Sequence, residues 1–280
     1  MTRLSEIYRA AEILPPFPKV AQRILKLLAD PETTVEKLVE TLRFDQGMTA
    51  NILRLSNSVQ FGLPRQVSSL NTAVSLLGHS KLMSIIVTSC SGQFMKRELS
   101  GYNLKDNELW LHAVGSAVAS SVITDMNRQD SPFLFTAALL HDIGKIILHT
   151  FVRDEFRKII ELVNRENISF PEAEKEVLGM DHAQIGAKIL GKWGFPEQIV
   201  ESVRIHHEPA KYLQNDLAAM VALSDLMSIL LGIGTGIDGM TYTGPEELFS
   251  TCGITEGGLD DCLAELWIQF QAAEELLSIR

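Results

Sequence analysis

Apolar residues recur with a helical period along most of this chain. Between Val20 and Leu28 they lie three or four positions apart, which is the spacing of a helix that buries one face. The same spacing returns in the segments 107–126, 131–150, 153–166, 170–178, 182–192, 196–205, 214–231 and near 258–279. No segment shows the alternation of apolar and polar residues that indicates a strand. The sequence therefore predicts an all-α fold, a multi-helix bundle.

Capping residues predict where several helices begin and end. A Ser or Thr followed three positions later by Glu forms a capping box, and the chain has two of them, Thr33 with Glu36 and Ser169 with Glu172. Gly78 interrupts a long apolar stretch, so we expect it to end one helix just before another begins. Further N-caps are expected at Asp45 and Ser69.

The chain divides into three segments of different composition. The polar, turn-rich stretch 98–106 separates an N-terminal helical subdomain, residues 1–100, from a second helical subdomain, residues 101–231. Residues 232–280 hold a loop with five glycines up to residue 245, followed by a C-terminal helix. Within this loop, Gly232–Gly236 has the glycine spacing of a phosphate-binding loop, but no strand precedes it and no Lys-Ser/Thr pair accompanies it. We therefore interpret it as a connection.

The bulk composition fits a folded acidic protein. The 280 residues are 46% hydrophobic and 21% charged, which suffices for a sizeable core with an ordinary surface. A net charge of −10 disfavours nucleic acids and anionic membranes as partners. The N-terminus does not resemble a signal peptide, and no apolar run reaches the ~20 residues of a membrane helix. Three widely spaced cysteines, Cys90, Cys252 and Cys262, are expected to be buried reduced thiols. These features predict a cytoplasmic protein.

Histidines and aspartates recur through the second subdomain. The series is His112, His141-Asp142, His182, His206-His207 and Asp225. The dyad His141-Asp142 lies in the apolar segment 137–145, where a buried aspartate is costly unless its charge is compensated. A cation supplies that compensation, and imidazole with carboxylate suits Fe, Mn, Zn, Co or Ni better than Ca. We therefore expect one or two divalent first-row metal ions, whereas His79 and His149 are expected to be ordinary histidines.

The spacing of these residues constrains how they hold metal. Adjacent residues on a helix point about 100° apart, so His141 and Asp142 share an ion only where other helices converge on it. His112 and Asp225 would have to come from such helices. A second ion would be held by the imidazoles of the remaining group, with the Asp142 carboxylate as the bridge: His182, His206 and His207.

Short motifs follow one another in order between residues 10 and 230. In the first half they are Leu14–Pro18, Phe44–Asp45, Leu53–Ser58 and Ala73–Gly78. In the second half they are Leu109–His112, Ala138–Lys145, His182–Gly186 and Trp193–Pro196. Together they resemble the HDOD (HD-related output domain) branch of the HD superfamily. The resemblance implies an HD-type helical core preceded by an N-terminal helical subdomain, in a family where many members have lost metal ligands and act as signalling modules.

The candidate ligands also resemble those of a related enzyme group. All seven match the histidines and aspartates of the di-metal set in the cyclic-dinucleotide phosphodiesterases called HD-GYP. Glu108 precedes His112 by one helical turn, where some of those enzymes carry a further ligand. However, His206-His207-Glu208-Pro209 runs into Ala-Lys-Tyr-Leu rather than into a Gly-Tyr-Pro signature. The resemblance therefore implies metal binding more than cyclic-di-GMP cleavage.

Two functions follow as alternatives. The first is a bacterial signal-transduction domain, mainly non-catalytic, whose metal is a structural clamp or a sensor and whose N-terminal helices meet a signalling protein partner. The second is a metal-dependent phosphohydrolase acting on a nucleotide or cyclic dinucleotide. In that enzyme, two ions bridged by Asp142 would activate a water, and Lys145 would neutralise a phosphate oxygen. For Lys145, a solvated position on a helix face is the competing interpretation.

Overall fold

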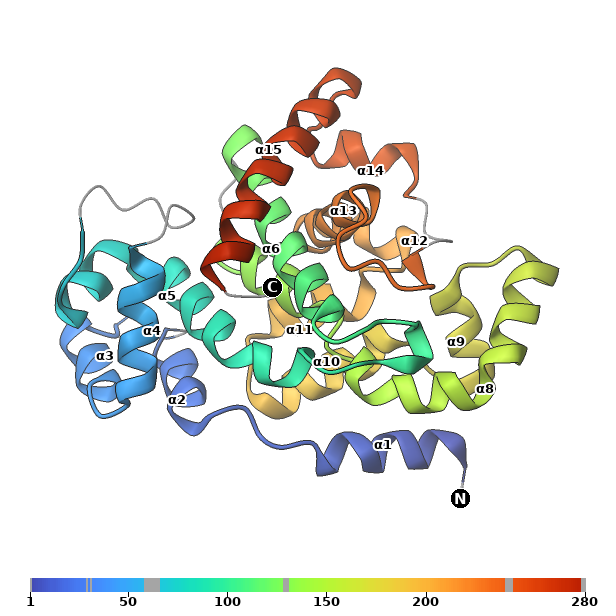
Figure 1. Ribbon diagram of the computed structural model, residues 1–280, viewed down its shortest axis with the longest axis horizontal. Coiled ribbons are helices and arrows are strands. Elements are labelled where there is room, and N and C mark those ends of the chain that lie inside the picture. The colour runs from blue at the N-terminus through green and yellow to red at the C-terminus, as the bar shows by residue number, and fades with distance from the viewer. Residues whose placement is uncertain are drawn as a thin grey trace.

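The computed structural model describes residues 2–28, 30, 32–57, 66–127, 131–239 and 244–277. Over these ranges the regular elements are helices, and the β-type pairing is confined to an isolated bridge between Leu99 and Leu104. The predicted all-α fold is therefore confirmed (Figure 1).

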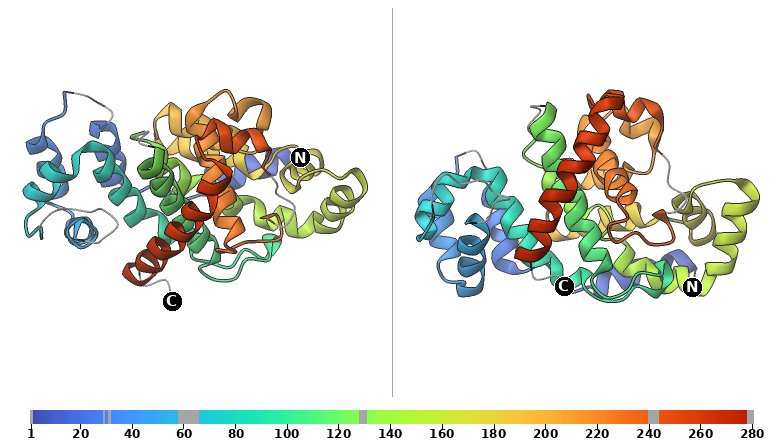
Figure 2. Two further views of the ribbon diagram at one scale, coloured as in Figure 1. Left: turned by 90° about the horizontal axis from the view of Figure 1, so that it is seen from above. Right: turned by 45° about the horizontal axis from the view of Figure 1, so that its top comes forward.

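The N-terminal helices form a lobe to one side of the larger part of the molecule, as the views in Figures 1 and 2 agree. The first helices are α1 (Arg3–Ile13), α2 (Lys19–Leu28), α3 (Val35–Leu42), α4 (Gln46–Ser56) and α5 (Leu70–Met95). The lobe consists of α2, α3, α4 and the first part of α5, which pack against one another. α5 continues from the lobe into the larger part, so it joins the two.

The larger part is built around α6, which packs against α7, α13 and α15. Its helices are η2 (Ser100–Tyr102), α6 (Glu108–Asn127), α7 (Leu134–Leu140), α8 (Lys145–Glu166), α9 (Phe170–Leu178), α10 (His182–Trp193), α11 (Glu197–Ile205), α12 (Pro209–Tyr212), α13 (Asp216–Leu230), α14 (Glu246–Thr251) and α15 (Glu256–Leu276). One continuous hydrophobic cluster of buried residues runs from α1 to α15. The sequence did not predict α1 or α14.

α1 lies against this larger part rather than against the lobe (Figure 1). Lys192 of α10 donates to the carbonyl oxygens of Ala11 at 3.2 Å and Glu12 at 2.6 Å. Arg3 pairs with Glu155 of α8 at 2.5 Å. Tertiary contacts of this kind do not appear in a short hydrophobic pattern, which explains why α1 was missed.

Gly78 bends α5 as predicted. Its φ of 68° and ψ of 178° lie outside the helical region, so α5 consists of two helices meeting at this residue. A residue with a side chain adopts such a positive φ only with strain. The capping box at Ser169 and Glu172 is also confirmed. The one predicted at Thr33 is wrong by one position, because Thr34 accepts from the Lys37 amide while Thr33 is buried.

The helices predicted at 131–150 and 153–166 are divided differently. α7 ends at Leu140, a turn covers residues 141–144, and α8 runs without a break to Glu166. The His141-Asp142 dyad therefore lies in a turn, and its expected place within a helix is wrong. The turn packs directly on α10: a Cβ on Gly144 would collide with the carbonyl oxygen of His182 and lie 2.7 Å from the Gly186 nitrogen.

Two segments are long and apolar enough to cross a membrane by length and composition, Leu70–Met95 and Leu134–Glu166, whereas the sequence pattern predicted no run of that length. Their most apolar windows are 61% and 78% buried inside the protein itself. Their apolar surface is therefore largely taken up by the hydrophobic core. The three cysteines are buried, and none forms a disulfide, as predicted.

Candidate metal centre

Seven candidate ligands from separate elements meet at one place in the larger part. They are His112 of α6, His141 and Asp142 of the turn, His182 of α10, His206 and His207 directly after α11, and Asp225 of α13. Six are buried and His207 is partly buried. The convergence that the sequence analysis required is therefore observed.

Local structure fixes the helix boundaries at which two of the ligand histidines lie. Asp181 caps α10: its carboxylate accepts from the Gln184 amide at 2.7 Å, and the Gln184 side chain accepts from the Asp181 amide at 3.3 Å. This capping box starts the helix at His182. At the other helix, His206 is the C-cap of α11, and the chain turns there before Pro209.

One group of ligand atoms surrounds Oδ2 of Asp142. His141 Nε2 lies 3.3 Å from this oxygen and His112 Nε2 lies 3.6 Å from it. Both imidazoles also approach Asp225 Oδ1, at 3.5 Å and 2.9 Å respectively. The four side chains thus bring imidazole nitrogen and carboxylate oxygen atoms close together. These are ligand types that divalent first-row metal ions accept.

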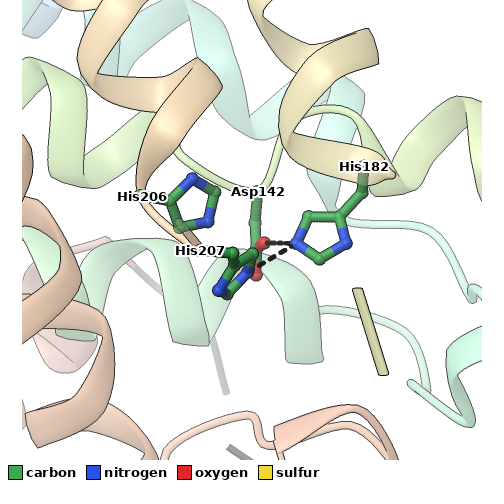
Figure 3. A group of neighbouring side chains, drawn as sticks. All are labelled: Asp142, His182, His206 and His207. Atoms are coloured by element: carbon green, nitrogen blue, oxygen red, sulfur yellow. Dashed lines mark hydrogen bonds and ion pairs between the residues drawn. The ribbon is translucent and has the colours of Figure 1, made fainter. Parts of the chain in front are cut away.

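A second group surrounds the other oxygen of Asp142 (Figure 3). His182 Nε2 lies 3.2 Å from Asp142 Oδ1 and 2.9 Å from His207 Nε2. The rings of His206 and His207 are 3.9 Å apart between centroids. The ligand atoms of Asp142, His182, His206 and His207 all lie within 4.8 Å of one another. Asp142 therefore divides its two oxygens between two groups of imidazoles.

The inner ring nitrogens are held by fixed acceptors. Nδ1 of His112 donates to the Ile233 carbonyl oxygen, and Nδ1 of His141 donates to that of Ala138. Nδ1 of His206 donates to the Val203 carbonyl oxygen. Nδ1 of His182 donates to the Glu174 carboxylate. Each Nε2 therefore faces the centre. Nε2 of His141 and of His206 is buried without a hydrogen-bond partner. Because buried polar atoms are seldom left without a partner, the residues present fit a bound metal ion.

Protons on neighbouring histidines balance the negative charges of the buried carboxylates in the cluster. Burial disfavours the imidazolium of His141, but Asp142 and Asp225 raise its pKa to about 10. Burial likewise opposes the charge on His182, but Glu174 and Asp142 raise its pKa to about 10. Burial would raise the pKa of Asp142, yet His141 and Lys145 hold it well below the usual value. Burial, followed by the charges of His141 and His182, lowers the pKa of His206 to about 3.

Lys145 lies beside the cluster and is buried, so the solvated position considered for it is wrong. Its Nζ is 2.6 Å from Asp142 Oδ2 and 2.5 Å from Asp238 Oδ2. Burial alone would lower the Lys145 pKa, but these two carboxylates raise it. Its charge is therefore compensated within the protein.

The other candidates lie outside these two groups and outside a third, formed by His141, His206 and Asp225. Glu108 is partly exposed, and its Oε2 accepts from the Lys105 amide at 2.7 Å. His79 is exposed and His149 is half-buried, as expected for histidines outside a metal centre.

Two acidic residues of the site were missed in the sequence. Glu174 is fully buried, accepts from His182 at Nδ1 and at the backbone, and accepts from the Tyr102 hydroxyl at 2.5 Å. A signal existed, because Glu174 lies midway between Phe170 and Leu178 on the apolar face of α9. Asp238 lies among the glycines of the predicted loop, and no spacing rule singled it out.

An all-helical fold with a buried His/Asp cluster that could hold a metal ion is that of a domain of the HD type. The HDOD domain model matches residues 14–209. The chain therefore belongs to the HDOD family, as its motifs predicted. It spans 37% and 16% of the length of the two curated relatives that it matches.

Solved structures share the fold over nearly the whole chain. An HDOD domain protein of Geobacter sulfurreducens has a TM-score of 0.74 and 27% identity, with 98% of this chain and 97% of that chain covered. A candidate phosphohydrolase of Shewanella amazonensis has a TM-score of 0.72 and 22% identity, covering 97% of each chain. A candidate signal transduction protein of Marinobacter aquaeolei has a TM-score of 0.71 and 22% identity, covering 95% of this chain and 59% of that one.

Proposed function

We propose that this chain is a metal-binding signal-transduction domain, mainly non-catalytic, that holds one or two divalent first-row ions. Its ligands would be the seven clustered histidines and aspartates. The name of the Marinobacter relative supports a signalling context. The N-terminal helices would meet a protein partner in the cytoplasm, and neither nucleic acid nor membrane is expected to bind this acidic chain.

The closed state of the centre carries this proposal. The cavity beside His112, Asp142 and Asp225 has a volume of about 10 Å³, which is room for about one water molecule or ion. A nucleotide could enter there only by displacing the residues that line the cavity. Lys145, the cation that would meet a substrate phosphate, is already paired with two carboxylates.

The second candidate is a metal-dependent phosphohydrolase, and the division of the Asp142 oxygens between two ligand groups favours it. When bound, a pair of divalent ions lowers the pKa of a coordinated water and so supplies a hydroxide at neutral pH. In this chain, Asp142 would bridge the two positions and Lys145 would stabilise negative charge. A nucleotide or cyclic dinucleotide would be the substrate.

Metal analysis followed by a phosphodiesterase assay distinguishes the two. The full chain is purified, its metal content is measured, and turnover of bis-p-nitrophenyl phosphate and of a cyclic dinucleotide is assayed with Mn²⁺ or Fe²⁺. Bound metal without turnover is expected for the signalling domain. Two ions with turnover that Asp142→Ala abolishes would instead establish the enzyme, and a chain that binds no ion would contradict both.

A further inference from the structure

Residues 232–239, which we call the strap, lie across the metal centre. The Ile233 carbonyl oxygen accepts from Nδ1 of His112 at 2.9 Å, and the Ile237 amide donates to the Tyr102 carbonyl oxygen at 3.0 Å. Gly234 and Gly236 allow this close approach. A Cβ on Gly234 would collide with the Glu108 carbonyl oxygen, and one on Gly236 would lie 2.9 Å from the Tyr102 carbonyl oxygen. The strap thus lies directly on α6 and η2.

Asp238 ties the strap to the centre through Lys145. The exposed fractions of Asp238, Lys145 and Asp142 are 7%, 5% and 1%, so the three charges are shielded from solvent. Lys145 Nζ lies between the two carboxylates, 2.5 Å from Asp238 and 2.6 Å from Asp142. Asp142 belongs to both main ligand groups, whereas Asp238 belongs to none of the three groups found among the described residues. Asp238 therefore contacts the ammonium group of Lys145 but is not one of the candidate metal ligands.

The strap also accounts for the small size of the cavity. Gly234, Thr235, Gly236 and Asp238 line it together with His112, Asp142 and Asp225. The remaining volume of about 10 Å³ admits about one water molecule or ion. A phosphate group can reach Lys145 only after the strap, with the Asp238 carboxylate, has moved away.

We propose that Asp238 occupies the position of a phosphate group, and that the natural ligand of this centre is a phosphate-bearing anion that replaces Asp238 on Lys145 and lifts the strap. This inference rests on the proposed metal-binding function, because the ions and Lys145 together form the anion site. Carboxylate and phosphate both accept charge-assisted hydrogen bonds from an ammonium group. Since the two anions compete for one cation, ligand binding and strap closure oppose each other reciprocally.

The strap then converts ligand binding into a structural signal. Lifting it releases the contacts of Ile233 and Ile237 with α6 and η2. The closed strap also weakens the apparent affinity for the anion. A ligand that binds only the open state has its affinity reduced in proportion to the fraction of molecules that are open. Removing the charge of Asp238 should therefore raise anion affinity.

The test uses the full chain loaded with Mn²⁺, freed of excess ion, and inorganic phosphate as the probe. Metal content is measured first, and calorimetry then compares wild type with Asp238→Asn. We expect the variant to bind phosphate about 10- to 100-fold more tightly, since about 1–10% of wild-type molecules would be open. The control Asp154→Asn removes one negative charge from a carboxylate that is 47% exposed and pairs with Arg153, and it should leave phosphate affinity unchanged. In Asp238→Asn/Lys145→Gln the gain should disappear.

Hydrogen exchange on wild type provides an independent arm should Asp238→Asn fold poorly. Saturating phosphate should speed amide exchange in residues 233–238 and leave α2, α3 and α4 unchanged. Equal phosphate affinities in wild type and Asp238→Asn at equal metal content would overturn the proposal, as would phosphate binding without faster strap exchange. A chain without bound metal would overturn the proposed function itself, and the preceding metal measurement identifies that outcome separately.

Discussion

At the scale of single residues, the acceptor behind each histidine decides which ring nitrogen faces the metal centre. A carbonyl oxygen can only accept, so the contacts to Ala138 and Val203 place a proton on Nδ1 of His141 and His206. His182 differs, because its acceptor is the negative side chain of Glu174. A carboxylate behind an imidazole fixes the ring and makes its other nitrogen a stronger ligand.

Glu174→Gln should therefore weaken metal binding. Glutamine keeps the shape of the side chain but removes its charge, and loss of such an outer partner typically lowers metal affinity by about 10- to 100-fold. Competition with a chelator of known affinity measures the change. Glu172→Gln is the matched control, because Glu172 lies on the same helix but only caps Ser169, and its metal affinity should match wild type. Equal affinities in all three proteins would show that Glu174 does not position His182.

Metal binding should release protons. In the metal-free protein, His141 and His182 have a pKa raised to about 10, so both rings are charged at pH 7. A metal ion takes the neutral ring, so up to about two protons leave on binding, and affinity rises with pH up to about 10. For the same reason the metal-free fold loses stability between about pH 6.5 and 10, because the unfolded rings are already neutral above about pH 6.5.

Calorimetry in buffers of low and high ionisation enthalpy measures the number of protons released. The heat of Mn²⁺ binding at pH 7 should depend on the buffer, with a slope of about two protons per chain if both rings are freed. Identical heats in the two buffers would mean that the imidazoles are neutral before metal arrives.

At the scale of elements, periodicity predicted most of the helices but not their exact division. The bend at Gly78 was predictable because glycine interrupts an apolar run. The break between α7 and α8 was not, because residues 137–150 continue the helical pattern through the His141-Asp142 dyad. What decides the break is the packing of Gly144 against the carbonyl oxygen of His182, a contact between segments about forty residues apart.

Gly144→Ala tests whether this contact forms the turn. The added methyl group would meet backbone atoms of His182 and Gly186 that cannot move separately, so we expect a loss of about 1–3 kcal/mol or more in the free energy of unfolding. Gly191→Ala, on the same α10, meets nothing within 4 Å and should gain up to about 1 kcal/mol from helix propensity. Urea unfolding compares them, and similar stability of the two variants would refute the argument.

At the scale of the whole molecule, the site joins elements that the sequence could list but not assemble. The ligands come from α6, the turn 141–144, α10, the end of α11 and α13. Their residue types and order revealed the chemistry, since histidine and aspartate in apolar helices need compensation. Which oxygen of Asp142 meets which imidazole, and how Glu174 and Asp238 close the site, depends on packing between helices that no spacing rule describes.

The location of the ligands predicts which part of the molecule a metal ion stabilises. Among the described residues, α2, α3 and α4 contribute nothing to the three ligand groups. An ion present at 100 times its dissociation constant stabilises the fold by about 2.7 kcal/mol. For a chain of 280 residues that corresponds to roughly 5 °C in Tm, since each kcal/mol moves Tm by about 2 °C. EDTA should therefore lower the Tm of the metal-loaded chain by this amount while leaving Asp142→Asn unaffected.

Removal of the ion by EDTA should also quicken hydrogen exchange in α6, α10, α11 and α13 but not in α2–α4. Uniform quickening would show that the ion supports the whole molecule instead.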